Sequence, residues 1–165
     1  MRFTAVGLPA GILVSVTAFV TAGGGFLLAI LYADLLHDVQ ALGHRGPELP
    51  DTVLASISGF YRRVTISARP LNRLVVVVMI EVLGSIGVQI ARGDHPRWVA
   101  WASLPLAGAP IALAGLRTFP AAVQLGGRTD PPTVQSRLAR SILRDHLLCV
   151  AGIGSLLAVQ LAFAT

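Results

Sequence analysis

The feature that most constrains this chain is a set of four apolar stretches, each about as long as the ~20 residues that a helix needs to cross a bilayer. They comprise residues 9–33, 71–91, 98–116 and 142–163. The chain is 54% hydrophobic and 13% charged, whereas soluble domains carry about 25% charged residues. The sequence therefore predicts an all-α fold, a four-transmembrane-helix bundle that forms one integral membrane domain over residues 1–165.

The basic residues are all arginine, and their distribution predicts how the bundle is oriented. Ten lie in the connections that follow the first and third stretches or, for Arg73 and Arg144, at the adjoining start of the second or fourth stretch, and three lie elsewhere. Cytoplasmic connections are enriched in Arg and Lys, so we expect both long connections in the cytoplasm and both termini outside the cell, in the inner or plasma membrane. Membrane lipids, and not nucleic acid, are the expected partners. Three of the arginines have helical spacing and are candidates for binding a lipid headgroup or an anionic substrate: Arg137, Arg140 and Arg144.

The connection between the first two spans contains a predicted amphipathic helix over residues 52–68. Apolar residues recur there at the i, i+3, i+4 and i+7 spacing of a helix with one buried face. Such a helix lies along the cytoplasmic interface or caps the bundle. The connection between the third and fourth spans is expected to leave the helical conformation near Pro120 and Gly126, and the last helix is expected to start after Asp130.

Glu81 is the only ionisable residue in the apolar run from Leu74 to Ala91. An acid at the centre of a membrane helix costs about 2.5–3.5 kcal/mol on insertion scales, so polar partners are expected. At ~1.5 Å rise per residue Glu81 lies roughly 15 Å deep, near the midplane. Glu81 is therefore a candidate functional residue.

Further polar residues lie where two predicted helices meet the cytoplasmic side. Asp34 and His37 lie at the end of the first span, and Asp145 and His146 lie at the start of the fourth. Since adjacent helical residues are about 100° apart, Asp145 and His146 cannot both point squarely inward. We expect Asp34, His37, Glu81 and His146 to converge in the cytoplasmic half of the bundle.

Three chemistries suit such a cluster. His37, His146, Asp34 and Glu81 are candidate ligands for zinc or non-haem iron. A carboxylate paired with a histidine would instead serve acid–base catalysis. Glu81 could also carry protons or ions between the two sides. The residues do not decide whether the protein uses no cofactor or a non-haem metal ion.

The second half of the chain contains five segments with a recognisable pattern: Tyr61 to Pro70, Arg97-Trp98, Ala109-Pro110, Arg117 to Leu125 and Ser141 to His146. In these segments, over about residues 61–163, the chain resembles the anthrone oxygenase-like family of small four-helix membrane proteins. In that family the last helix carries a histidine before an apolar run, and a tyrosine-to-proline segment precedes helix two. The resemblance implies roles for His146 and Tyr61 in oxidation of an aromatic polyketide-like molecule by oxygen.

The chain departs from the pattern of the family in two places. Ala121 and Ala122 stand where the family has paired asparagines, and Cys149 stands where it has an arginine. These differences imply a changed activity if the family's residues at those positions act on the substrate.

The sequence favours a membrane-embedded oxygenase or oxidase-like enzyme that acts on a lipophilic substrate. The candidate catalytic residues are His146, His37, Glu81, Asp34 and Tyr61. A non-enzymatic membrane subunit or homo-oligomer is the alternative, indicated by the glycine- and alanine-rich faces of the first and last helices. A small proton-coupled transporter that uses Glu81 is the third possibility.

Overall fold

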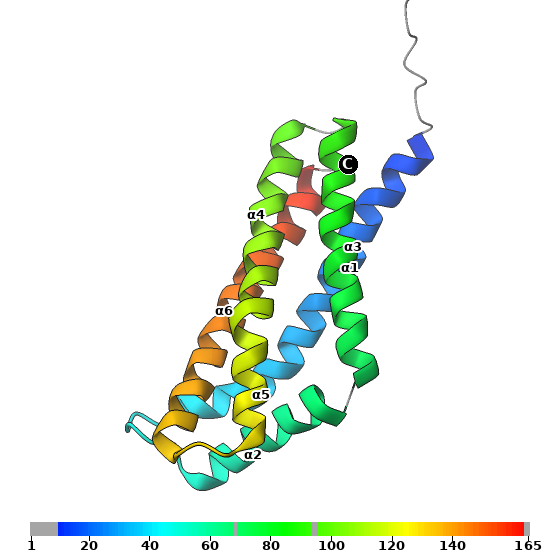
Figure 1. The fold of residues 1–165 in the computed structure, drawn as a ribbon. Coiled ribbons are helices and arrows are strands. Elements are labelled where there is room, and N and C mark those ends of the chain that lie inside the picture. Colours follow the sequence, from blue (N-terminus) through cyan, green and yellow to red (C-terminus); the bar gives the residue numbers. More distant parts are fainter. Residues whose placement is uncertain (1–9, 68, 94–95, 164–165) are drawn as a thin grey trace, which may run out of the picture.

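The computed structural model describes residues 10–163 except residues 68, 94 and 95, and the described residues are helical with short connections and no strand. Two of the shorter segments, η2 and η3, are π-helical, and η1 is a 3₁₀ helix. The all-α prediction is confirmed. The elements shown in Figure 1 are α1 (Ala10–Asp38), η1 (Val39–Gly43), α2 (Asp51–Arg62), η2 (Arg63–Ser67), α3 (Arg69–Arg92), α4 (Arg97–Leu113), η3 (Ala114–Thr118), α5 (Phe119–Gly127) and α6 (Pro132–Phe163).

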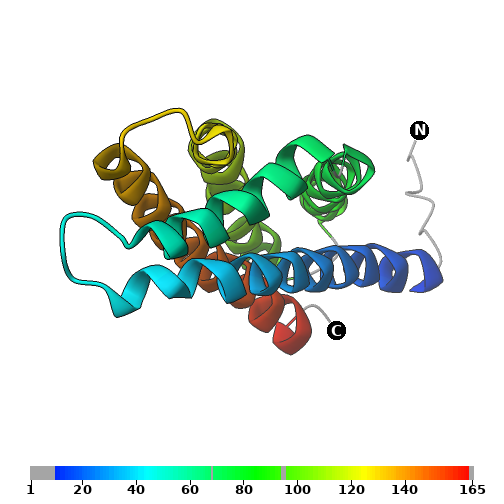
Figure 2. The same ribbon diagram turned by 90° about the horizontal axis from the view of Figure 1, so that it is seen from below.

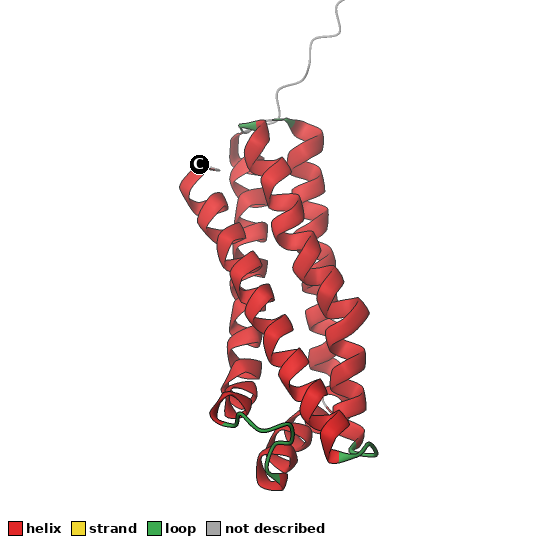
Figure 3. Cartoon of the chain, turned by 90° about the vertical axis from the view of Figure 1, so that its left-hand side faces the viewer, coloured by secondary structure: helices red, strands yellow, loops and turns green. Residues whose placement is uncertain are grey.

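Four helical segments are long and apolar enough to cross a membrane, which confirms the predicted bundle and makes this a multi-pass membrane protein. α1 packs against α3 and α6, and α4 packs against the same two helices, so the four form a closed ring. Large apolar side chains, such as Val77 and Ile80 of α3, are exposed on the outside of the ring. The connections lie at the two ends of the bundle (Figure 3). The four segments are Val16–Gly43, Pro70–Arg92, Arg97–Gly127 and Pro132–Phe163.

The predicted amphipathic helix is present as α2, extended by the π-helical turn η2. It crosses the end of the bundle that carries both long connections (Figures 1 and 2). Leu54, Ile57 and Tyr61 form its buried face and join a core with Leu125 of α5 and Ile142 of α6. α2 thus caps the bundle.

The predicted break directly after the third span, near Pro120 and Gly126, is wrong, because the chain stays helical from Arg97 to Gly127. Pro120 has no N–H, and its ring would clash with a carbonyl in a regular preceding turn. The wider π-helical turn η3 lies directly before it and makes room for the ring. α5 ends at Gly127, and the next residue, Arg128, is left-handed with φ 52° and donates its N–H to the Leu125 carbonyl.

The backbones of α5 and α2 approach closely at Gly126. A Cβ atom at this position would lie 2.9 Å from the backbone nitrogen and 3.1 Å from the Cα of Arg62. A backbone cannot move aside as a flexible side chain can, so any larger residue would separate the two helices. The packing of the α2 cap therefore depends on this glycine.

Replacing Gly126 with alanine is expected to lower the free energy of unfolding by about 1–3 kcal/mol, as overpacking in well-packed cores does. Gly127→Ala is the matched control, since a Cβ there meets nothing within 4 Å. Thermal unfolding of both variants in detergent measures the difference. Equal melting temperatures for the two variants would contradict the close approach.

In the half of the bundle away from α2, a polar network that the sequence did not predict joins the helices. The side chains of Gln89 in α3 and Gln160 in α6 donate to each other at 3.1 and 3.0 Å. Gln160 also donates to the Ser103 hydroxyl of α4 at 2.9 Å, and Gln89 donates to Thr17 of α1 at 3.4 Å. The network bonds all four spanning segments to one another.

Candidate acid–base site

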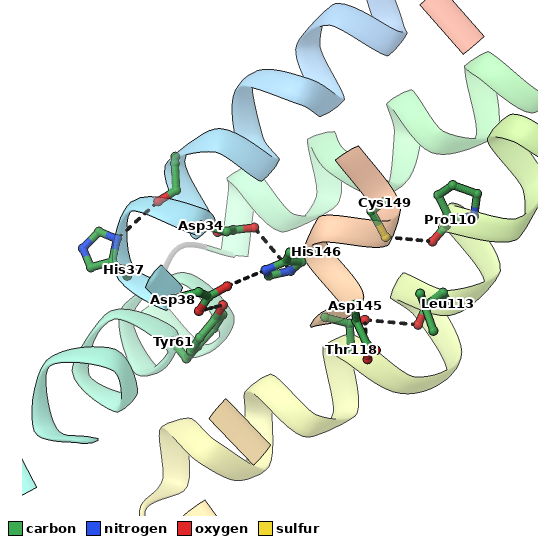
Figure 4. Close-up of polar contacts among 11 residues, drawn as sticks. Asp34, His37, Asp38, Tyr61, Pro110, Leu113, Thr118, Asp145, His146 and Cys149 are labelled. Carbon is green, nitrogen blue, oxygen red and sulfur yellow. Dashed lines mark hydrogen bonds and ion pairs between the residues drawn. The ribbon is translucent and has the colours of Figure 1, made fainter. Parts of the chain in front are cut away.

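Asp38, the last residue of α1, is the centre of the main buried polar cluster (Figure 4). Its carboxylate is 0% exposed and accepts two short hydrogen bonds. The Tyr61 hydroxyl of α2 donates to Oδ1 at 2.7 Å, and Nδ1 of His146 in α6 lies 2.7 Å from Oδ2. Charge-assisted bonds of this kind are about twice as strong as neutral ones.

Each partner reaches Asp38 because of the element that carries it. Tyr61 is one turn beyond Ile57 on the buried face of α2, and the packing of α2 beneath the bundle brings its hydroxyl under the end of α1. His146 is 6% exposed and lies on the face of α6 that packs against α1. Three elements far apart in the sequence therefore build the cluster.

Asp34 lies one helical turn before Asp38 and approaches the other nitrogen of the same ring. Its Oδ2 is 3.8 Å from Nε2 of His146. The imidazole thus has a carboxylate on each side. Because Asp38 accepts, the bond assigns the proton to Nδ1, and this leaves the lone pair of a neutral ring on Nε2. The second nitrogen is therefore free to take a proton.

The Tyr61 phenol acts as a hydrogen-bond donor in this arrangement. Burial raises its pKa far above the ordinary value, and the neighbouring Asp38 carboxylate raises it further. The phenol thus keeps its proton, and its role is to hold Asp38 in place.

The predicted convergence of four residues is confirmed for Asp34 and His146 and wrong for His37. The His37 ring stacks on Phe60 with centroids 3.9 Å apart and planes at 11°. Its Nδ1 donates to the Ala33 carbonyl at 3.2 Å, so it points away from Asp38.

Glu81 also lies outside the cluster. Its Oε1 accepts from the Ser85 hydroxyl at 3.1 Å. Its other oxygen faces Gly23 of α1, where a Cβ would lie only 2.6 Å away. The polar partner that the sequence predicts for this acid is therefore Ser85. The small residue Gly23 leaves room for the Glu81 side chain between α1 and α3.

The predicted set of metal ligands is not assembled. In the part of the chain that the structure describes, no three His, Cys, Asp or Glu side chains are placed to hold a metal ion. Asp34 and His146 of the candidate set meet, while His37 and Glu81 are directed elsewhere. The arrangement fits acid–base chemistry better.

Asp145 faces a different helix from its neighbour His146, as their angular separation requires. It is 2% exposed and accepts from Arg117 Nε at 3.2 Å and from the Thr118 hydroxyl at 3.4 Å, both in η3. Since α6 packs between α1 and α4, both faces are buried. Asp145 joins α6 to the third span.

The three candidate binding arginines of α6 differ in their surroundings. Arg140 donates to the carbonyls of His44, Gly46 and Pro47, so it fixes the connection before α2. Arg137 and Arg144 are exposed, and a role in headgroup binding stays a prediction for them.

Asp38, the centre of the site, is not among the residues predicted from the sequence. Its i, i+4 spacing to Asp34 is the signal that could have indicated it, because this spacing places two carboxylates on one helix face.

No protein-family model, curated protein or solved structure matches this chain.

Proposed function

We propose that this protein is a small membrane-embedded enzyme of the oxygenase or oxidase type, in which His146 removes a proton from a lipophilic substrate. The observation that carries the proposal is the His146 ring, held at Nδ1 by a fully buried carboxylate at 2.7 Å. A base oriented in this way is the usual arrangement for general acid–base catalysis.

The proposed reaction starts with transfer of a C–H proton from an anthrone-like substrate to Nε2 of His146. The electron pair left on carbon reduces O₂, and a C–O bond forms to give a hydroperoxide after reprotonation. Loss of water then gives a ketone, so one O₂ is consumed and one water is released for each CH₂ converted to C=O. This balance requires no organic cofactor.

The remaining side chains of the cluster support the base. Asp38 fixes the tautomer and stabilises the positive imidazolium that forms, and Tyr61 holds Asp38 in place. The Asp34 side chain is 19% exposed and lies near Nε2, so it offers the imidazolium proton a way out. Each role follows from a bond or a distance within the cluster.

The resemblance to the anthrone oxygenase-like family supports the same proposal. The two residues that it carries over, Tyr61 and His146, both bond to Asp38. Of the departures, Ala122 is buried at the contact with α2, and the Cys149 thiol donates to the Pro110 carbonyl at 3.6 Å. A substrate that differs from the family's is compatible with these changes.

The proposed orientation places the capped end of the bundle in the cytoplasm. Both long connections and most arginines are at that end, as the positive-inside rule requires. The site then lies in the cytoplasmic half of the inner or plasma membrane.

The test is oxygen consumption by purified protein in nanodiscs with anthrone as the probe substrate. His146→Ala is expected to lower the rate by about 10²–10⁴-fold, the range supplied by a positioned acid or base. His37→Ala is the matched control, because it removes a histidine of α1 that lies outside the cluster. Equal rates for the wild type and His146→Ala would exclude the proposed base.

A further inference from the structure

A second polar site lies at the other end of the bundle, where α3 connects to α4. A cavity of about 280 Å³ is present there. The residues that line it include Gln89, Arg92, Arg97 and Trp101. Along α6, His146 and Gln160, the bonded partner of Gln89, are separated by roughly 21 Å at 1.5 Å per residue. The cavity is therefore distinct from the acid–base site.

The two arginines of this cavity have charge that the described residues do not balance. Neither forms an ion pair with a residue that the structure describes. Nη1 of Arg92 is fully buried, and of all the buried side-chain N and O atoms described it alone has no hydrogen-bond partner. A buried charged donor without an acceptor is strongly unfavourable, so an acceptor from outside the described chain is expected.

We propose that this cavity binds a phosphate-type oxyanion, supplied either by a phospholipid headgroup or by free phosphate. Guanidinium groups match phosphate with paired N–H donors, and two of them provide the charge for one such anion. The volume is slightly below the ~300 Å³ at which small-molecule sites begin, so it suits a headgroup and not a whole lipid.

The surroundings of the cavity are those of a membrane–water interface. Trp98 and Trp101 are both about half-exposed in the first turns of α4. Amphipathic rings of this kind gather at the level of the lipid headgroups. The lining also includes Gln89, whose side chain is bonded to Gln160 and Thr17, so this part of the lining is held in place.

The experiment compares the full-length wild type, Arg92→Gln/Arg97→Gln and Arg45→Gln/Arg63→Gln. The last is the control, because it removes two exposed arginines at the capped end, which have no proposed binding role, and changes the net charge equally. Native mass spectrometry after delipidation measures retention of added phosphatidylglycerol against phosphatidylcholine. Thermal unfolding in lipid-free detergent with millimolar inorganic phosphate measures binding of the free anion.

We expect at least a tenfold loss of retained phosphatidylglycerol, or loss of stabilisation by phosphate, in the Arg92/Arg97 variant alone. The first result would identify a lipid headgroup as the source, and the second would identify free phosphate. Equal behaviour of the two double variants would overturn the proposal. Binding seen only after Asp94→Asn would also overturn it, because that carboxylate, which lies outside the described residues, would then be the natural partner of the arginines.

Discussion

Replacing Asp38 with alanine is expected to lower the free energy of unfolding by about 2–6 kcal/mol, the cost of two buried hydrogen-bond donors that lose their acceptor. The reason is that Asp38 is fully buried and accepts from both Tyr61 and His146. Alanine leaves two buried donors without an acceptor, and each of these costs about 1–3 kcal/mol. Unfolding by SDS titration in mixed micelles measures the loss.

Asp38→Asn separates the structural role of this carboxylate from its catalytic role. The amide oxygen can still accept from Tyr61, while its NH₂ group donates to Nδ1 of His146 and forces the ring proton onto Nε2. We therefore expect most of the stability to be kept and the oxygen-consumption rate with anthrone to fall by at least about 100-fold. The neutral ring would have no lone pair on the side of Asp34.

The control for both variants is Asp51→Ala. The Asp51 side chain is 86% exposed and pairs with Arg128 at the surface. Surface pairs contribute about 0–1 kcal/mol, so little change is expected in stability or rate. If Asp38→Ala unfolded at the same SDS fraction as Asp51→Ala, the buried cluster would not be a source of stability. If Asp38→Asn kept the full rate, the assignment of the His146 proton to Nδ1 would be wrong.

The fold was largely predictable because hydrophobic length and charge placement are strong signals in a membrane chain. The four spans follow from the lengths of the apolar stretches. The amphipathic helix follows from the helical period of its apolar residues. Tertiary packing overrides neither signal. The connection after the third span was not predictable, since Pro120 and Gly126 are local break signals. The π-helical turn η3 and the contact of Gly126 with Arg62 decide that segment, and both depend on tertiary packing.

The site was only partly predictable, for a reason of angle and depth. His37 and Asp38 lie about 100° apart on α1, on either side of Asp34, so spacing alone fits both of them. The packing of α2 decides which of them joins the cluster, because it places Phe60 against His37 and Tyr61 against Asp38. Glu81 was predicted to join the cluster because the cost of burying an acid indicates that it has a polar partner, but not which residue that partner is. In the structure Ser85 donates to Glu81, and Gly23 lies against its other oxygen.

The other large effect is expected from Gly152→Val, at the contact of α6 with α4. A Cβ at Gly152 would lie 2.5 Å from Cγ of Pro110 and 3.1 Å from the carbonyl oxygen of Leu106. The proline ring is rigid, and the carbonyl belongs to the backbone, so the helices must separate. Valine adds two further methyl groups to this clash, and we expect a loss of about 3 kcal/mol, the upper end of the usual range for overpacking.

Gly154→Val is the matched control for this change. It adds the same side chain two residues along α6, where a Cβ meets nothing within 4 Å. In thermal unfolding in detergent, the melting temperature of Gly154→Val should therefore be close to that of the wild type, and that of Gly152→Val should be lower by several degrees.

A second measurement uses the thiol of Cys149, which bonds to the Pro110 carbonyl at the same contact. Separation of α4 from α6 should expose this thiol, so a maleimide should modify Cys149 faster in Gly152→Val. A Gly152→Val protein that melts with the control and protects its thiol would show that α4 and α6 are not packed as closely as the structure has them.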